Sequence, residues 1–391
     1  MSETPGVRSV QFIDNYFPVI DGVTLTVHQY AQHMNAAVVC PAMVSRYREK
    51  YHFSYPLIVS RTLRVPFSRY TVAVPALDGK LPASVLDQNP EIFHAHSPSL
   101  LGKYAVSLGR KERTPVVATF HSKVYDAVFE FTKSKTIAKM VTGRIVRLYE
   151  ACDEVWACSE ESGETLRSYG FRKPYYVMPN GTEVSVPENA AELRERAENV
   201  FRIPPGKKVL LFVGQQIWYK NQRLILDTFR LLCDRDEDWF LVMAGAGKDE
   251  KDIERYAASL NLSDDRIRFA GLVRDRDLLS GLYLAADLLF FPSVFDNAPL
   301  VLREAAVLGT PSLVTEGSNA AGAICKDVNG FTAKATPEAM RDEIVRIFSC
   351  MDLRRVGEKA RETIPVSWEK LAGMVQDRYR TVIERYRGKG S

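Results

Sequence analysis

The chain of 391 residues lacks the features that mark membrane-spanning, secreted and zinc-stabilised proteins. It has no run of about 18 or more apolar residues, so we expect no membrane-spanning helix. Residues 1–13 lack a basic region followed by an apolar core, so we expect no secretory signal. The six cysteines are scattered and form no CxxC pair, which argues against a structural zinc site. We therefore expect a reduced, cytoplasmic protein.

The net charge of the chain is small, but it is unevenly distributed. The whole chain carries a formal charge of +4, whereas the segment from Arg46 to Arg147 holds 17 Lys or Arg against 7 Asp or Glu. Such an excess favours an anionic partner. No recognition helix, zinc finger or aromatic RNA-binding pattern is present, so a membrane surface is the better candidate and no nucleic-acid partner is expected.

Short apolar strands alternate with helical patterns along most of the chain, which predicts α/β domains with largely parallel, doubly wound sheets. The length favours two domains. Residues 182–206 are charged and flanked by proline, which is typical of a connection between domains. We expect a first domain over 1–182, a linker over 183–206, a second domain over 207–366 and a C-terminal helix over 367–391 that packs on the first domain.

Residues 287–313 contain the most informative local pattern. An apolar strand (288–291) is followed by a loop with the carboxylate of Asp296, and then by a helix that opens near Pro299 and carries Glu304. Proline is favoured in the first turn of a helix, and the free amides there attract phosphate. A carboxylate accepts two hydrogen bonds at once, which suits a diol. The segment therefore fits a site for diphosphate, ribose and hexose, but an ordinary strand–loop–helix unit with two solvated acids is an equal alternative.

Several short motifs occur in one order along the chain. In sequence order they are Phe17-Pro18…Gly22-Val23, His94-Ala95-His96-Ser97-Pro98, Thr119-Phe120-His121, Asn180-Gly181, Val213-Gly214…Lys220, Ala244-Gly245-Ala246-Gly247, Phe269-Ala270-Gly271, the 296–304 segment and Asn329-Gly330-Phe331. With these motifs the chain resembles the retaining GT-B glycosyltransferases of the group 1 family (family 4), possibly its glycolipid-forming branch. Each motif alone is weak evidence, whereas their joint order and spacing are specific.

The resemblance implies a GT-B fold, in which two Rossmann-like domains face each other across a cleft. It implies metal-independent transfer of a hexose, with retention of configuration, from a UDP-sugar or GDP-sugar to an acceptor hydroxyl. The acceptor would be a saccharide or a membrane glycolipid, and no cofactor is needed. Two other functions remain open: a sugar-nucleotide epimerase or hydrolase of the same fold, and a nucleotide-sugar-binding protein that has lost its activity.

The resemblance also implies which residues form the site. The catalytic residues would be His121, Asp296 and Lys220. The donor and nucleotide would be bound by Gly22, Gly214, Gln215, Lys220, Gly245, Val273, Ala298, Pro299, Leu300 and Glu304. Two departures from the family pattern stand out: Gln215 replaces an arginine, and Asp296 replaces a glutamate, which shortens the reach of the carboxylate by about 1.5 Å. These two departures favour the inactive alternative.

Histidine and basic residues allow two further interpretations. His94 and His96 have the spacing of a metal-binding pair, but they lie in the family's strand-end motif, so we expect them to be structural and expect no metal. His121 also has a structural alternative, as a hydrogen-bonded loop residue. The segment 133–148 places apolar residues near one face of a helix, surrounded by positive charge from Lys133, Lys135, Lys139, Arg144 and Arg147. It fits either docking on an anionic membrane or an ordinary helix that covers the sheet.

Overall fold

The chain forms two units in a computed structural model, which describes residues 6–19, 21–42, 53–64, 71–234 and 238–388. The first unit is Met1–Gly181 together with Ser367–Ser391, and the second is Thr182–Val366. Parts of the basic segment, residues 46–52 and 65–70, lie outside the described residues. Among the described residues no helix is long and apolar enough to cross a bilayer.

The first unit is built on a parallel sheet with the strand order β3-β2-β1-β6-β7-β8-β9. Its strands are β1 (Ser9–Phe12), β2 (Ala37–Pro41), β3 (Leu57–Ser60), β6 (Ile92–Ala95), β7 (Val116–Phe120), β8 (Glu154–Ala157) and β9 (Tyr175–Val177). Most of the central strands are buried over their whole length, as expected for a sheet covered on both faces. An antiparallel pair, β4 (Thr62–Arg64) and β5 (Thr71–Ala73), accompanies it.

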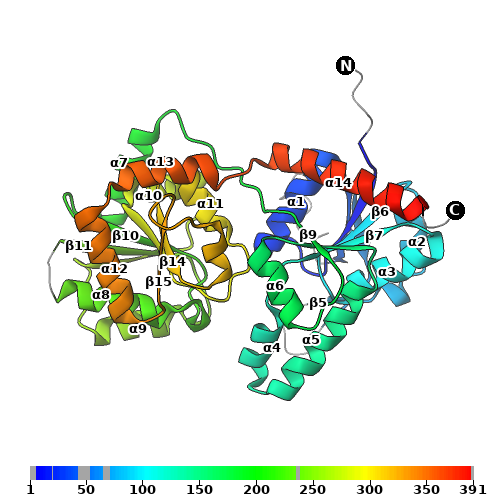
Figure 1. The fold of residues 1–391 in the computed structure, drawn as a ribbon, viewed down its shortest axis with the longest axis horizontal. Coiled ribbons are helices and arrows are strands. Elements are labelled where there is room, and N and C mark those ends of the chain that lie inside the picture. The colour runs from blue at the N-terminus through cyan, green and yellow to red at the C-terminus, as the bar shows by residue number, and fades with distance from the viewer. Residues whose placement is uncertain (1–5, 20, 43–52, 65–70, 235–237, 389–391) are drawn as a thin grey trace. The chain divides into compact units, whose positions relative to one another are not determined.

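Helices surround this sheet, and one of them comes from the C-terminal end of the chain. They are α1 (Gly22–Met34), α2 (Leu81–Leu86), α3 (Leu100–Glu112), α4 (Val124–Thr132), α5 (Lys135–Glu150), α6 (Glu160–Ser168) and α14 (Trp368–Gly388), with a short 3-10 turn η2 (Pro75–Leu77). In Figure 1 the red helix α14 lies beside the blue helix α1, and the two are in contact. The apolar face of α14, including Leu371, Val375 and Tyr379, is buried.

A buried carboxylate fastens α14 to the sheet. Glu154, at the start of β8, accepts hydrogen bonds from Arg378 at 2.7 Å (Nε) and 2.6 Å (Nη2), and Arg385 forms a further ion pair with it. The indole of Trp156 donates to the same carboxylate at 2.7 Å. Burial by itself would raise the pKa of Glu154, but the hydrogen bonds from Arg378, Trp156 and Arg385 outweigh it and hold the pKa below its ordinary value.

The second unit repeats the architecture with the strand order β12-β11-β10-β13-β14-β15, again all parallel. Its strands are β10 (Lys208–Val213), β11 (Trp239–Ala244), β12 (Ile267–Gly271), β13 (Leu288–Phe291), β14 (Ser312–Thr315) and β15 (Phe331–Ala333). The expectation of parallel, doubly wound α/β sheets is thus confirmed in both units.

The helices of the second unit begin before its first strand. They are α7 (Ala190–Phe201), α8 (Gln222–Cys233), α9 (Glu250–Ser259), α10 (Arg276–Ala285), α11 (Leu300–Val307), α12 (Pro337–Cys350) and α13 (Leu353–Thr363), with 3-10 turns η3 (Trp218–Lys220) and η4 (Asn319–Ala323). Helix α7 lies within the segment 183–206 that the sequence presents as a linker. It buries Leu193, Ala197 and Phe201 and packs on α10.

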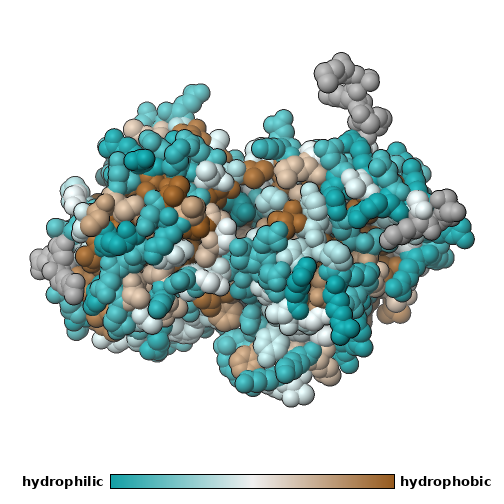
Figure 2. All heavy atoms as spheres, in the orientation of Figure 1, coloured by the Kyte–Doolittle hydropathy of each residue, from teal (hydrophilic) through white to brown (hydrophobic). Residues whose placement is uncertain are grey.

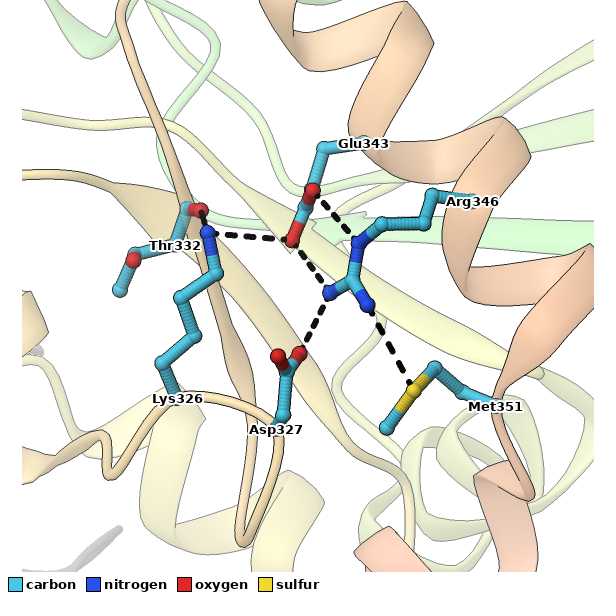
Figure 3. Close-up of polar contacts among 6 residues, drawn as sticks. All are labelled: Lys326, Asp327, Thr332, Glu343, Arg346 and Met351. Carbon is cyan, nitrogen blue, oxygen red and sulfur yellow. Dashed lines mark hydrogen bonds and ion pairs between the residues drawn. The ribbon is translucent and has the colours of Figure 1, made fainter.

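A charged network holds the turn before β15 against α12 (Figure 3). Arg346 donates to both carboxylate oxygens of Glu343 at 2.9 and 2.8 Å, and it also pairs with Asp327. Lys326 lies 3.5 Å from the same Glu343 carboxylate and donates to the carbonyl of Thr332. Because these turn residues precede β15, they lie at the amino edge of the parallel sheet, opposite to the edge where ligands bind in such folds.

Candidate active site

The strand order of the second unit defines a switch point between β10 and β13. From β10 the chain proceeds outward through β11 and β12, and then it returns to β13 on the other side of β10. The loops that follow two such neighbouring strands diverge, and this opening at the carboxyl edge is where open α/β sheets bind ligands. Here the two loops are residues 214–221 after β10 and 292–299 after β13.

An ion pair joins these two loops. The ammonium of Lys220, at the end of η3, contacts Oδ1 of Asp296, and the hydroxyl of Ser293 donates to Oδ2 of Asp296 at 2.5 Å. The side chains of Lys220 and Asp296 are only 15% and 18% exposed. The structure therefore brings together two residues that the sequence assigns to one site, and both oxygens of Asp296 are engaged.

Two more contacts flank this ion pair. The side-chain amide of Asn221 donates to the carbonyl oxygen of Pro292 at 2.8 Å. The rings of Tyr219 and Phe295 meet edge to face with their centroids 5.2 Å apart. Three consecutive residues of the first loop thus contact the second loop, so the position of Lys220 is determined by both loops. Asn221 has a left-handed backbone (φ 61°), which lets η3 end and α8 begin within one residue.

Glycine allows the neighbouring loops to approach each other closely. A Cβ atom at Gly245, where φ is +131°, would lie 1.9 Å from the carbonyl oxygen of Gly214. One at Gly247 would lie 2.2 Å from the carbonyl oxygen of Gln216. Both glycines follow β11, and any larger residue would push away the loop that leads to Lys220. The adjacent Gln215 is exposed, and Val273, which follows β12, is half-buried against the core of the unit.

Glu304 lies on α11 and is nearly buried. Its Oε2 accepts a hydrogen bond from the hydroxyl of Tyr283 at 2.8 Å, and its Oε1 lies 3.4 Å from a guanidinium nitrogen of Arg276. Burial and then the Glu304 carboxylate raise the pKa of Tyr283 well above its ordinary value, so this phenol stays protonated and keeps donating. Tyr283 and Arg276 thereby hold the carboxylate in one orientation. Pro299 caps α11 without giving a side-chain hydrogen bond to its first turn.

The first unit brings three histidines together at the carboxyl edge of its sheet. His94 ends near Thr119 (2.7 Å) and the Tyr379 hydroxyl (2.6 Å), and is fully buried. His96 and His121 are joined by a hydrogen bond of 2.9 Å between Nδ1 of His96 and Nε2 of His121. Burial lowers the pKa of all three, that of His121 to about 3, so all three imidazoles are neutral near pH 7.

The hydrogen-bond partners assign the proton positions in this chain. The amide nitrogen of Gln11 donates to Ser9 Oγ at 2.9 Å, so its carbonyl oxygen faces His96 Nε2 at 2.8 Å. His96 therefore carries its proton on Nε2, and its Nδ1 accepts from the Nε2–H of His121. His121 is left with an accepting Nδ1, 3.8 Å from the thiol of Cys158. The donor nitrogen of His121 is thus used inside the protein.

Gly22 lies apart from this histidine chain, at the beginning of α1. The residue before it, Asp21, caps the helix by accepting a hydrogen bond from the Thr24 amide at 2.8 Å. One carboxylate oxygen of Asp21 therefore serves the helix end. The segment Asp21–Gly22 gives α1 a capped start immediately after the loop that follows β1.

Two family models match the chain in sequence order. The model described as Glycosyltransferase Family 4 matches residues 20–186, and the model described as Glycosyl transferases group 1 matches residues 194–363. Between them they span most of both units. The chain belongs to the group 1 glycosyltransferases. The resemblance that the motifs indicate is therefore confirmed.

Curated relatives of this glycosyltransferase agree with the family. It is 25% identical over 309 residues to an alpha-monoglucosyldiacylglycerol synthase of Streptococcus pneumoniae, with 77% of this chain and 69% of the relative covered. It is also 25% identical over 333 residues to a GDP-mannose-dependent alpha-mannosyltransferase of Corynebacterium glutamicum, with 81% and 74% covered.

Solved structures of glycosyltransferases share the fold. HepE of Anabaena in complex with UDP matches with a TM-score of 0.76 at 16% identity, over 96% of this chain and all of that one. Sucrose-phosphate synthase from Thermosynechococcus elongatus matches with a TM-score of 0.74 at 17% identity, over 97% and 100%. The predicted GT-B class, with two Rossmann-like domains, is thereby confirmed.

Within the described ranges, the glycosyltransferase has no group of three or more His, Cys, Asp or Glu side chains arranged to hold a metal ion. The two residues with metal-binding spacing, His94 and His96, use their ring nitrogens for hydrogen bonds to protein groups.

The five basic residues of the segment 133–148 are all exposed, but they do not lie on one helix. Lys133 caps α4 with a left-handed backbone (φ 52°) and pairs with Glu130 at 2.5 Å, whereas the other four lie on α5. Helices α4 and α5 pack against each other, and the surface over them mixes hydrophobic and hydrophilic residues (Figure 2). Three apolar side chains there are also exposed: Phe131 (91%), Ile137 (41%) and Met140 (50%).

Several residues of the site escaped the motifs. Ser293, Tyr283 and Arg276 orient the two carboxylates, and Gln11 and Cys158 contact the histidine chain. Each of them meets its partner only through the fold. Ser293 alone had a local signal, because it lies three residues before Asp296 in the same loop.

Proposed function

We propose that this glycosyltransferase is a retaining, metal-independent enzyme that moves a hexose from a UDP-sugar or GDP-sugar to an acceptor hydroxyl. One observation carries the proposal: a lysine and two oriented carboxylates meet at the switch point of the second sheet. The names of the relatives, which include a GDP-mannose-dependent enzyme and a glucolipid synthase, support the substrate class.

The residues of the second unit divide the donor among them. Lys220 and the first turn of α11, around Ala298, Pro299 and Leu300, bind the diphosphate. Glu304 accepts hydrogen bonds from the ribose, and Asp296 accepts them from the hexose. Gly214, Gln215, Gly245 and Val273 line the nucleotide. Residues 207–366 thus act as the donor domain and residues 1–182 as the acceptor domain, with Gly22 approaching the diphosphate.

The reaction needs charge stabilisation more than a strong base. Departure of the nucleoside diphosphate puts negative charge on its phosphate oxygens and positive charge on the anomeric carbon. The ammonium of Lys220 stabilises the leaving group. The acceptor oxygen forms its bond to the anomeric carbon from the same face, and its proton goes to a diphosphate oxygen. A neutral His121 suits a place near this carbon, because an imidazolium would repel the developing cation.

Nucleotide binding tests the proposal directly. In a thermal-shift screen with UDP, GDP, ADP and their sugar conjugates, the correct nucleotide at 100 times its Kd should stabilise the protein by about 2.7 kcal/mol. For a unit of this size that raises Tm by about 5–10 °C. The variant Lys220→Ala should lose most of the shift, whereas Asp327→Asn, at the opposite edge of the sheet, should keep it. No shift with any of these ligands would refute the proposal.

An activity assay separates this function from its two alternatives. An epimerase or hydrolase would consume nucleotide sugar equally well with and without an acceptor. An inactive relative would bind the donor without turnover, and restoring the family residues with Gln215→Arg and Asp296→Glu would then raise turnover. The proposed transferase releases nucleotide quickly only when an acceptor is present.

A membrane glycolipid is the acceptor that we propose, with the enzyme cytoplasmic and peripheral on the inner face of the membrane. The exposed Phe131, Ile137 and Met140 among basic residues of α4 and α5 support this, because apolar insertion and positive charge together bind anionic lipid.

Charge reversal on α5 tests membrane docking. The triple variant Lys135→Glu/Lys139→Glu/Arg144→Glu should bind phosphatidylglycerol-containing vesicles on the order of 100-fold more weakly, at about 1 kcal/mol for each basic residue. Vesicle sedimentation at low and high salt measures the effect. The matched control, Arg110→Glu/Lys111→Glu/Arg113→Glu near the end of α3, changes the same charge and should bind much better. Equal binding by both triple variants would exclude α5 as the docking surface.

A further inference from the structure

The ion pair between Lys220 and Asp296 has a consequence for any diphosphate that binds there. The carboxylate of Asp296 is a competing anion for the ammonium that the diphosphate needs. Both side chains are more than four-fifths buried, so water screens their interaction less than it would on the surface. The hydroxyl of Ser293 stabilises the carboxylate further with its 2.5 Å hydrogen bond.

The surrounding contacts make this pair a fixed feature of the two loops. Asn221 is bonded to the Pro292 carbonyl on one side of Lys220, and Tyr219 packs on Phe295 on the other. The Pro292 carbonyl also accepts from the hydroxyl of Thr315 at 2.8 Å, which ties the second loop to β14. Because the backbone on both sides is held, Asp296 stays within reach of Lys220, and a ligand cannot relieve the competition by moving the loops apart.

We propose that Asp296 acts as the built-in counter-ion of Lys220 and makes the site prefer the intact sugar donor to the nucleoside diphosphate product. The inference rests on the proposed function and assigns a further role to one of its residues. A bare diphosphate puts two like-charged groups beside one ammonium, which is unfavourable. The hexose of the intact donor offers hydroxyl groups to Asp296, and these hydrogen bonds compensate the carboxylate for the lost contact with Lys220.

Transfer of the hexose removes that compensation. The product keeps its diphosphate but has no sugar hydroxyl for Asp296, so the carboxylate again competes for the ammonium and promotes release of the product. In this view the shorter aspartate serves a purpose: its reach matches Lys220 through the contact that the structure shows. The device changes the relative affinities of donor and product and needs no movement of either unit.

Calorimetric titration of the enzyme with UDP and GDP, and with their hexose conjugates, tests the inference. Asp296→Asn keeps the size of the side chain and removes its charge, so it should bind the nucleoside diphosphate about tenfold more tightly than wild type. Its affinity for the sugar donor should not rise in proportion, so the preference for donor over product should fall. Asp296→Ala should also tighten product binding, whereas Asp296→Glu keeps the charge and should not.

Asp327→Asn serves as the matched control, because Asp327 pairs with Arg346 at the amino edge of the same sheet and should leave both affinities unchanged. If wild type binds the nucleoside diphosphate but Asp296→Asn and Asp296→Ala bind it equally or more weakly, the counter-ion role is wrong and the proposed function stands. If neither wild type nor any variant binds nucleotide or sugar donor, the proposed function and the inference both fail.

Discussion

Replacing Lys220 with alanine should lower kcat/KM for sugar transfer by about 10³-fold. The ammonium is the one cationic group in contact with the two ligand loops at the switch point that we assign to the diphosphate, and charge on the leaving group develops next to it. Removal of a single pre-organised donor from such a position costs 10²- to 10³-fold in typical enzymes. The variant also leaves Asp296 without its ion-pair partner beside the diphosphate, which weakens binding as well.

Steady-state kinetics with a radiolabelled sugar donor measure this effect. Lys359→Ala is the control, because Lys359 is an exposed lysine of the same unit that pairs only with nearby Glu362. The double variant Lys220→Ala/Asp296→Asn should recover part of the lost nucleotide affinity, since the repelling carboxylate is gone. A Lys220→Ala enzyme within threefold of wild type would mean that the diphosphate is stabilised elsewhere.

Glu154→Gln should destabilise the first unit by about 3 kcal/mol at pH 7. The change leaves the partly buried guanidinium of Arg378 without its carboxylate, and breaking a buried pair on one side costs about 3–5 kcal/mol. The folded-state pKa of Glu154 lies below its ordinary value. Its contribution is therefore complete above the unfolded-state pKa of about 4.5 and is lost as the pH falls through the folded-state pKa.

Urea denaturation of wild type and Glu154→Gln between pH 7 and pH 4 measures this prediction. Both proteins should also lose stability below about pH 6.5, because the neutral histidines His94, His96 and His121 take up protons on unfolding. That loss is common to both and cancels in their difference, which reports Glu154 alone. Glu130→Gln, in an exposed pair, should change little. A constant difference down to pH 4 would contradict the depressed pKa.

The sequence predicts the sheets well because their strands are short, apolar and closed by turn residues. The range 116–120 coincides with β7, and 288–291 coincides with β13. It is less informative where one residue decides the backbone. The pattern of 133–148 continues one amphipathic period, but Lys133 adopts a left-handed conformation and Ser134 caps a new helix, which separates α4 from α5.

The candidate site shows the same division. Lys220 and Asp296 follow strand ends, so the parallel topology alone brings their loops together. Their contact, and the hydrogen bond from Ser293, depend on loop geometry that no pattern encodes. The link from Gln11 through His96 to His121 joins residues up to 110 positions apart along the chain, and only the folded sheet reveals it. Helix α7 did have a signal, since Leu193, Ala197 and Phe201 recur every four residues.

A crystal structure of the enzyme with its sugar nucleotide is the most direct test of donor binding by the second unit. The account predicts diphosphate oxygens within hydrogen-bonding distance of Lys220 Nζ, the ribose on Glu304, and hexose hydroxyls on Asp296. A donor bound elsewhere, with Lys220 still paired with Asp296 and no ligand atom near Glu304, would contradict it.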